Sequence, residues 1–262
     1  MIGEQVIGIV GGMGPESGIM LCNYINSLTP VTKDQEHLSM VLMSFPKHIV
    51  DRTAFLEGKI RVNPAFQISK VVRKLESAGA TIIGIACNTA HSSVIFDEIK
   101  KDLNKRRSTL KLLHMPQITC DILGKTYPEV KRVGVISTNG TYKSKIYESA
   151  LKERGYEVIL PNFEFQDNVI HKMIYDVDFG IKASPNIRTK EVKQLKNKTL
   201  DFFYKNNVEA IILGCTELSL VFSENTSGIK VIDSTMSLAR ALVQEASIVH
   251  TKNNEVRTLH TL

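Results

Sequence analysis

The stretch Thr-Ile-Ile-Gly-Ile-Ala-Cys-Asn-Thr-Ala-His runs from Thr81 to His91, and Glu-Ala-Ile-Ile-Leu-Gly-Cys-Thr-Glu, from Glu209 to Glu217, is a near copy of it. In both, a short apolar run ends at a cysteine, which is typical of a buried strand whose carboxyl end opens into a site. Cys87 and Cys215 therefore occupy equivalent places in two copies of one unit.

An earlier pair of strands repeats as well. Val6 to Val10 runs into a glycine-rich turn, and Arg132 to Ile136 runs into Ser-Thr-Asn-Gly. Gly8 precedes Cys87 by 79 positions and Gly134 precedes Cys215 by 81, so the spacing within the two halves agrees. This agreement indicates an internal duplication.

Strands that alternate with helical segments at this spacing predict an α/β fold. We expect two pseudosymmetric lobes, each a mostly parallel, doubly wound sheet flanked by helices, with the active site in the cleft between them. Lobe 1 is predicted to comprise residues 1–108 plus 230–262 and to carry Cys87. Lobe 2 is predicted to comprise residues 109–229 and to carry Cys215.

Composition limits the class of protein. The 262 residues are 43% hydrophobic and 23% charged, as in ordinary globular proteins, and the apolar runs are too short to cross a bilayer. The first five residues do not resemble a secretory signal, so we expect a cytoplasmic location. The basic runs at 100–111 and 190–198, within a net charge of +6, are typical of solvated helix faces, and no nucleic-acid partner is expected. The four cysteines form no Cys-x-x-Cys pair, which predicts free thiols and no metal site.

The first glycine turn is a candidate ligand-binding segment. Gly12, Met13 and Gly14 precede Pro15, which suits the first turn of a helix, and backbone amides exposed at such a turn can hold an anion. The glycine spacing resembles a dinucleotide fingerprint, but the proline and the lack of a later strand-ending acid argue against one. Arg52 either caps a helix or pairs with its neighbour Asp51, or its guanidinium receives a substrate carboxylate.

Two equivalent thiols on opposite sides of one carbon suit the inversion of a stereocentre. One thiolate removes a proton from one face while the other thiol supplies a proton to the opposite face. Either cysteine alone is better explained as a small buried apolar residue, but their equivalent positions reverse this and favour catalysis. His91 either has a core or capping role or polarises Cys87, and Glu217 is expected to face the site. Donors available for the substrate carboxylate are the amides of the first glycine turn and the side chains of Arg52, Asn88, Thr89, Thr138 and Thr216.

Taken together, the motifs resemble the aspartate/glutamate racemase superfamily, and its aspartate racemase branch in particular. The matching segments span nearly the whole chain: Gly11-Gly12-Met13-Gly14-Pro15, Asp34-Gln35-Glu36-His37, Asp51-Arg52-Thr53, Cys87-Asn88-Thr89-Ala90-His91, Gly140-Thr141 and Gly214-Cys215-Thr216-Glu217. The resemblance implies a cofactor-independent racemase of acidic amino acids that often forms a dimer.

By the same resemblance Cys87 and Cys215 are the acid/base residues, and Arg52 matches an arginine of the family's site. Glu217 stands where the glutamate racemase branch has histidine, which favours aspartate. The family's site lysine, expected in the loop after residues 174–175, has no match in register, and the nearest candidate is Lys182.

We therefore predict a cytoplasmic, metal-free and pyridoxal-free isomerase that interconverts L- and D-aspartate. Its expected partners are a small acidic amino acid and a second copy of the chain, with neither nucleic acid nor membrane. Three alternatives stay open: a racemase of glutamate or of broad specificity, a non-catalytic amino-acid sensor of the same fold, and a related isomerase or decarboxylase that acts on another dicarboxylate.

Overall fold

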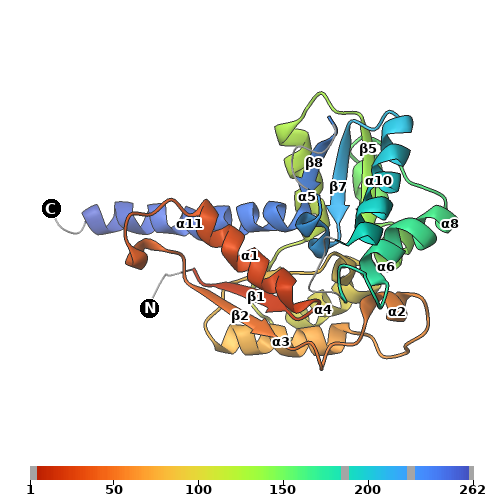
Figure 1. Cartoon of the computed structure of the whole chain (residues 1–262). Helices are drawn as coiled ribbons and strands as arrows, with labels where there is room; N and C mark the ends of the chain where they lie inside the picture. Colours follow the sequence, from red (N-terminus) through yellow and green to blue (C-terminus); the bar gives the residue numbers. More distant parts are fainter. Residues whose placement is uncertain (1–4, 184–188, 223–227, 260–262) are drawn as a thin grey trace.

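Two parallel four-stranded sheets form the framework of the protein (Figure 1). The computed structural model describes residues 5–183, 189–222 and 228–259, with the side chains of the last helix described as far as residue 247. The first sheet has the order β2-β1-β3-β4 and the second has the order β6-β5-β7-β8, so the strands of the two halves correspond one to one. The strands are β1 (Ile7–Gly11), β2 (Met40–Ser44), β3 (Ile82–Ile85), β4 (Lys111–Leu112), β5 (Arg132–Ser137), β6 (Glu157–Ile159), β7 (Ala210–Gly214) and β8 (Lys230–Asp233).

Helices cover both faces of each sheet. In the first half they are α1 (Pro15–Leu28), η1 (Asp34–Glu36), α2 (Arg52–Leu56), α3 (Ala65–Ser77), η2 (Asn88–His91), α4 (Ser93–Lys105) and α5 (Met115–Thr126). In the second half they are α6 (Asn139–Lys143), α7 (Ile146–Lys152), α8 (Phe163–Phe165), η3 (Gln166–His171), α9 (Lys172–Tyr175), α10 (Lys190–Lys205), η4 (Thr216–Leu220) and α11 (Ser234–Leu259). The predicted two-lobed α/β fold is confirmed.

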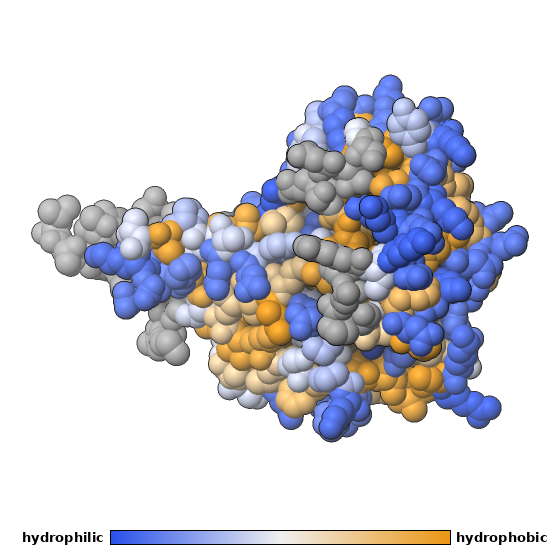
Figure 2. Space-filling view, in the orientation of Figure 1, coloured by the Kyte–Doolittle hydropathy of each residue, from blue (hydrophilic) through white to orange (hydrophobic). Residues whose placement is uncertain are grey.

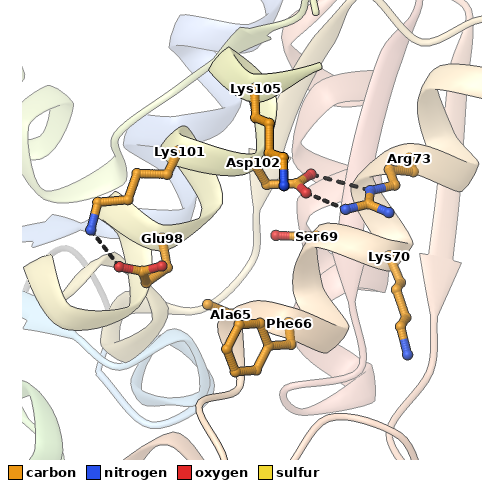
Figure 3. Close-up of a pocket in the computed structure, with 9 residues that line it drawn as sticks. All are labelled: Ala65, Phe66, Ser69, Lys70, Arg73, Glu98, Lys101, Asp102 and Lys105. Atoms are coloured by element: carbon orange, nitrogen blue, oxygen red, sulfur yellow. Dashed lines mark hydrogen bonds and ion pairs between the residues drawn. The ribbon is translucent and has the colours of Figure 1, made fainter.

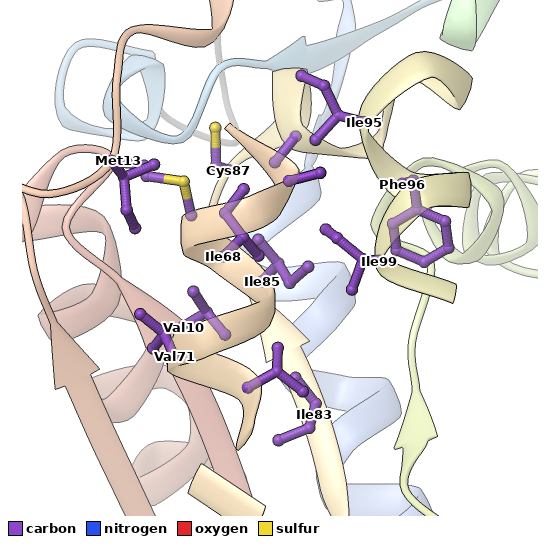
Figure 4. Packing of buried hydrophobic residues seen from close by; sticks show 14 of the residues in the cluster. Val10, Met13, Ile68, Val71, Ile83, Ile85, Cys87, Ile95, Phe96 and Ile99 are labelled. Atoms are coloured by element: carbon purple, nitrogen blue, oxygen red, sulfur yellow. The ribbon is translucent and has the colours of Figure 1, made fainter. Parts of the chain in front are cut away.

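The buried strands supply residues alternately to two cores, because successive side chains of a strand point to opposite faces. Ile7 and Ile9 of β1 pack under α1 and α11, whereas Val10 packs under α3 and α4. Figure 4 shows the second of these cores, with Cys87 and Met13 at one end of the cluster. This apolar core therefore extends to Met13 and Cys87, two of the predicted site residues.

Gly8 and Gly134 lie at equivalent places in β1 and β5 and serve the same purpose. A Cβ atom on Gly8 would lie 2.5 Å from Ile83 Cδ1, and one on Gly134 would lie 2.5 Å from the ring of Phe203. Only a residue without a side chain leaves room for this packing. The repeated glycine is therefore a packing requirement of both lobes.

The two lobes exchange a helix. α5 follows β4 of the first sheet, yet its Cys120 and Leu123 pack in a core of the second lobe. α11 follows β8 of the second sheet, yet its Leu238 and Leu242 pack in a core of the first lobe, alongside α1 (Figure 1). Each lobe is therefore completed by the chain that leaves the other.

The strands before these helices differ from the expected division of the chain. β4 hydrogen-bonds to β3 although residues 109–229 were predicted to form lobe 2, and β8 hydrogen-bonds to β7 although residues 230–262 were predicted to join lobe 1. β4 and β8 each complete the edge of their own sheet. The chain crosses to the other lobe only after each of these two strands. None of the helices among the described residues has the length and apolarity needed to cross a membrane.

Candidate active site

Cys87 and Cys215 face the same cavity. Each comes within two residues of the end of a central strand, β3 or β7, and each is the extended residue that precedes a short 3-10 helix. Both are 5% exposed, and both line one small, partly open cavity. The equivalence seen in the sequence is therefore also an equivalence of backbone position at the carboxyl ends of two parallel sheets.

The cavity also gathers most of the other predicted site residues. Its lining comprises Met13, Arg52, Cys87, Asn88, Thr89, Thr138, Tyr175, Lys182, Gly214, Cys215, Thr216 and Glu217. Gly12 and Gly14 instead line an adjoining cavity of about 670 Å³ that shares Met13, Arg52 and Glu217 with the first. The predicted residues thus lie in two connected spaces, an inner one with the thiols and an outer one bordered by the glycine turn.

Glu217 is the centre of the hydrogen bonds around Cys215. Its Oε1 accepts from the Lys182 ammonium and from the Gly14 amide at 3.3 Å. Its Oε2 accepts from Cys215 Sγ at 3.1 Å and from Thr216 Oγ1 at 2.9 Å. All four neighbours are donors, so the carboxylate form fits this position.

The charges of Glu217 and Lys182 stabilise each other. Burial opposes ionisation of Glu217, but the charge and the hydrogen bond of Lys182 lower its pKa to about 2. Burial also opposes the charge of Lys182, and Glu217 with Cys215 raises the pKa of the lysine above its usual range. Burial raises the pKa of Cys215 well above its ordinary value, and the neighbouring carboxylate adds to this effect. Cys215 is therefore held as a protonated thiol.

Cys87 has a cation as its neighbour instead. Arg52 begins α2, whose first turn is capped by Asp51, and its Nη2 donates to the Met13 carbonyl at 3.1 Å. Burial opposes the charge of Arg52, but Cys87, Tyr175 and Asp51 together raise the pKa of the guanidinium. Its buried Nε has no hydrogen-bond partner among the described residues. A side chain that lines the cavity together with Cys87 thus keeps one donor without a partner.

Polar side chains around the cavity join the two lobes. Thr89 Oγ1 lies 3.2 Å from Thr138 Oγ1 and 2.9 Å from Thr141 Oγ1, and Thr138 caps α6. Asn88 donates to Ser234 Oγ at 3.0 Å and accepts from the hydroxyl of Tyr147. These predicted residues therefore connect the two halves as well as line the cavity.

Tyr175 is a lining residue that the sequence did not identify. It ends α9, and its hydroxyl donates to Asp51 Oδ2 at 3.1 Å, which links the second lobe to the helix that carries Arg52. The only sequence signal was its place before the loop expected to hold a lysine. That loop brings Lys182 into the cavity.

His91 packs in the core and does not polarise Cys87, the other role considered for it. Its Nε2 lies 3.3 Å from the Ile85 carbonyl, and its ring contacts those of Phe96 and His114. Burial lowers its pKa well below the usual value, so it packs as a neutral ring. It does not line the cavity of the two cysteines.

Two further observations define the chemistry available. The described parts of the chain contain no group of three or more His, Cys, Asp or Glu side chains arranged to hold a metal ion. A separate groove between α3 and α4 holds about 770 Å³ and contains no cysteine, and its Arg73 pairs with Asp102 and its Lys101 with Glu98 (Figure 3). The side chains suited to acid–base chemistry therefore lie around the two thiols.

Comparison with known proteins shows the family. The family model described as Asp/Glu/hydantoin racemase matches residues 10–242. The chain belongs to the Asp/Glu/hydantoin racemase family. The expected class of enzyme, an isomerase that acts as an amino-acid racemase, is confirmed by this match.

Individual relatives of this racemase cover almost all of its length. It is 27% identical to the broad specificity amino-acid racemase RacX of Bacillus subtilis (strain 168), over 91% of this chain and 96% of that protein. It is 30% identical to the aspartate racemase of Picrophilus torridus, whose structure superposes with a TM-score of 0.74 over 93% of this chain and 94% of that one. An aspartate racemase homologue from Pyrococcus horikoshii OT3, 24% identical, has the same fold with a TM-score of 0.71 over 93% and 99% of the two chains.

Proposed function

We propose that this racemase interconverts L- and D-aspartate without a cofactor, by proton transfer between two thiols and the α-carbon. The observation that carries the proposal is that Cys87 and Cys215 follow equivalent strands and line one cavity. A molecule between them presents opposite faces of one carbon to the two sulfur atoms. Thiols suit the task because each can act as base or as acid.

The charges around the sulfurs support a division of roles. Arg52, a cation, lies beside Cys87 in the cavity. Cys215 is a thiol that donates to Glu217. In one direction the Cys87 thiolate takes the α-proton, the electron pair stays on the α-carbon and its carboxylate, and Cys215 gives its proton to the other face. The reverse direction begins with Cys215 as thiolate and Cys87 as thiol.

The charged groups around the cavity match an acidic amino acid. Aspartate has two carboxylates and one ammonium, and the cavity has two cations, Arg52 and Lys182, and one carboxylate, Glu217. Arg52 receives one carboxylate through its unpartnered donor, and Lys182 receives the other. Lys182 then turns from Glu217 to the substrate carboxylate. The substrate ammonium takes its place as the partner of Glu217.

A broader substrate range is the second candidate. Two observations favour it: the relative from Bacillus subtilis is a broad specificity amino-acid racemase, and the outer cavity of about 670 Å³ adjoins the thiol cavity. A longer side chain, such as that of glutamate, has room to extend into this outer space.

The experiment measures enantiomer formation by protein freed of cofactors. L-aspartate should yield D-aspartate by chiral chromatography, with solvent deuterium at the α-carbon of the product. Cys87→Ala and Cys215→Ala should each abolish the reaction, while Cys22→Ala, which removes a half-buried thiol of α1, should leave it intact. Full activity in either site variant rejects the two-thiol mechanism, and aspartate binding without turnover in the native protein favours a sensor.

The cellular location and the oligomeric state of the protein belong to the same proposal. The mechanism requires reduced cysteines, and all four cysteines of the chain are free, which supports a reducing compartment such as the cytoplasm. We also propose that the protein is a homodimer.

A further inference from the structure

Gly140 belongs to the short Gly-Thr motif of the sequence, and the proposed function gives it no role. It lies in α6, two residues after Thr138, whose side chain lines the cavity. The φ angle of Gly140 is not positive, so the backbone there does not require glycine. Alanine is also the better helix former. The reason for a glycine at this position therefore lies in its surroundings.

The surroundings of Gly140 leave no room for a side chain. A Cβ atom there would lie 2.7 Å from Thr53 Oγ1, 2.9 Å from Thr53 Cα and 2.9 Å from Thr89 Cγ2. The Thr53 Cα is a backbone atom and cannot rotate away. The methyl group of Thr89 is held as well, because its hydroxyl bonds to Thr138 and Thr141. The missing side chain thus lets α2 and η2 of the first lobe approach α6 of the second.

The other half of the duplicated chain has an equivalent glycine. Gly14 lies three residues after β1 ends, and Gly140 lies three residues after β5 ends. A Cβ atom on Gly14 would lie 3.1 Å from Glu217 Oε1. Glu217 and Thr89 each lie two positions after the cysteine of their own lobe. Each glycine therefore meets the same position of the opposite lobe, so the close approach is a repeated feature of the site.

The helix α2 is tied to the second lobe at both ends. Before it, Asp51 Oδ2 accepts from the Tyr175 hydroxyl at 3.1 Å, and after it, Glu57 Oε1 accepts from Lys143 Nζ at 2.9 Å. Figure 1 shows α2 next to α6, although the two helices come from different halves of the chain. On this side of the molecule the space-filling surface runs without a break from one lobe to the other (Figure 2). Gly140 packs between these two polar contacts.

We propose that Gly140 is a positioning residue for Arg52, because its contact with Thr53 fixes the first turn of α2. This inference rests on the proposed binding of a substrate carboxylate by Arg52. Thr53 directly follows Arg52, so a displacement of the Thr53 backbone also moves Arg52. The guanidinium is held on its other side by the Met13 carbonyl, and a small shift of α2 changes the geometry of the bonds that it offers to a ligand. The second lobe thereby sets the position of an anion-binding side chain that the first lobe carries.

The experiment measures the dissociation constant of L-aspartate by calorimetry, together with KM and kcat from initial rates. Gly140→Ala should raise the dissociation constant and KM about tenfold, because the new methyl group displaces Arg52. The rate constant kcat should fall less, since the atoms nearest to the methyl group belong to Thr53 and Thr89 rather than to either cysteine.

Gly134→Ala is the matched control. It introduces the same methyl group at 2.5 Å from the ring of Phe203, at a position that does not line the cavity. It should lower stability but leave the dissociation constant and KM within about twofold of the native values. A comparison of the two variants separates a displaced Arg52 from a general loss of packing.

Double variants test whether the effect passes through Arg52. In the Arg52→Lys protein, Gly140→Ala should weaken binding by no more than about twofold further, because the guanidinium that it displaces is already gone. Thr53→Ala removes the nearest contact of the new methyl group and should restore part of the affinity that Gly140→Ala loses. Tyr175→Phe adds no atom and releases only Asp51, so it tests the same idea if Gly140→Ala fails to fold. It should weaken binding about threefold, and again not in the Arg52→Lys protein.

The outcomes distinguish this inference from the proposed function. Native affinity in Gly140→Ala, or in Tyr175→Phe should the first variant not fold, overturns the inference even if the protein racemises aspartate. An equal loss of affinity in the Arg52→Lys background also overturns it. The expected changes in affinity without racemisation support the inference and reject the proposed function. A native protein that binds no aspartate overturns both.

Discussion

Removal of the buried charge of Glu217 should lower the stability of the folded protein strongly. Glu217→Gln keeps the size and shape of the side chain but places an amide group among four donors, and it leaves the ammonium of Lys182 without its carboxylate partner. Breaking a buried ion pair on one side is costly because the remaining charge has lost both water and partner.

The magnitude follows from the pKa of Glu217, which falls from its ordinary 4.5 to about 2 in the folded protein. At about 1.36 kcal/mol for each unit of pKa, ionised Glu217 stabilises the folded state by about 3 kcal/mol. The side chain is only 7% exposed, so solvent screens this interaction little. Because the folded pKa is the lower one, the stabilisation is complete above about pH 4.5 and disappears as the pH falls toward 2.

Urea unfolding and thermal melting measure this effect. At neutral pH Glu217→Gln should lose about 3 kcal/mol of unfolding free energy, a decrease of roughly 6 to 12 °C in Tm. Glu164→Gln, a change at an exposed carboxylate of α8, should cost less than about 0.5 kcal/mol. The double variant Glu217→Gln/Lys182→Met should regain part of the loss, because no unpaired charge remains.

Two results would refute this reasoning. One is a Glu217→Gln protein as stable as the native protein at neutral pH. The other is a loss of stability that stays constant as the pH falls to about 3, since a loss due to the charge must shrink as Glu217 of the unfolded chain takes up a proton below about pH 4.5.

Three other substitutions test separate parts of the structure. Arg52→Lys should raise KM for aspartate at least about tenfold, because lysine lacks the planar fork that binds carboxylates, and an unchanged KM in initial-rate measurements would exclude that role. Tyr175→Phe loses the 3.1 Å bond to Asp51 and should lower the unfolding free energy by about 1 kcal/mol in urea, with no loss if the bond is not formed in solution. Gly134→Ala forces a Cβ to within 2.5 Å of the Phe203 ring and should cost about 1 to 3 kcal/mol in the same assay, and a neutral result would mean that the core repacks freely.

The two cysteines that line the cavity could be predicted from the sequence because their signal is local. A β-branched or apolar run that ends at a cysteine defines a strand and its carboxyl end, and the same run occurs twice at the same distance from a glycine-containing first strand. Parallel strands direct their carboxyl ends to one side of a sheet, so the positions of Cys87 and Cys215 follow from that pattern. Thr89 and Thr216 lie within two residues of these cysteines, which is why they too were found, whereas Arg52, which begins α2, was found from its guanidinium and from the family resemblance.

Contacts between distant segments were decided only by the tertiary structure. Lys182 lacks a match in register, yet the loop after α9 brings it to Glu217, and Tyr175 crosses between lobes to Asp51. The exchange of α5 and α11, with β4 and β8 remaining in their own sheets, depends on which apolar surfaces each lobe leaves uncovered. A helix has the same periodic apolar face whichever lobe it covers, so the sequence determined the elements and their chemistry, while packing between the lobes determined which residues meet.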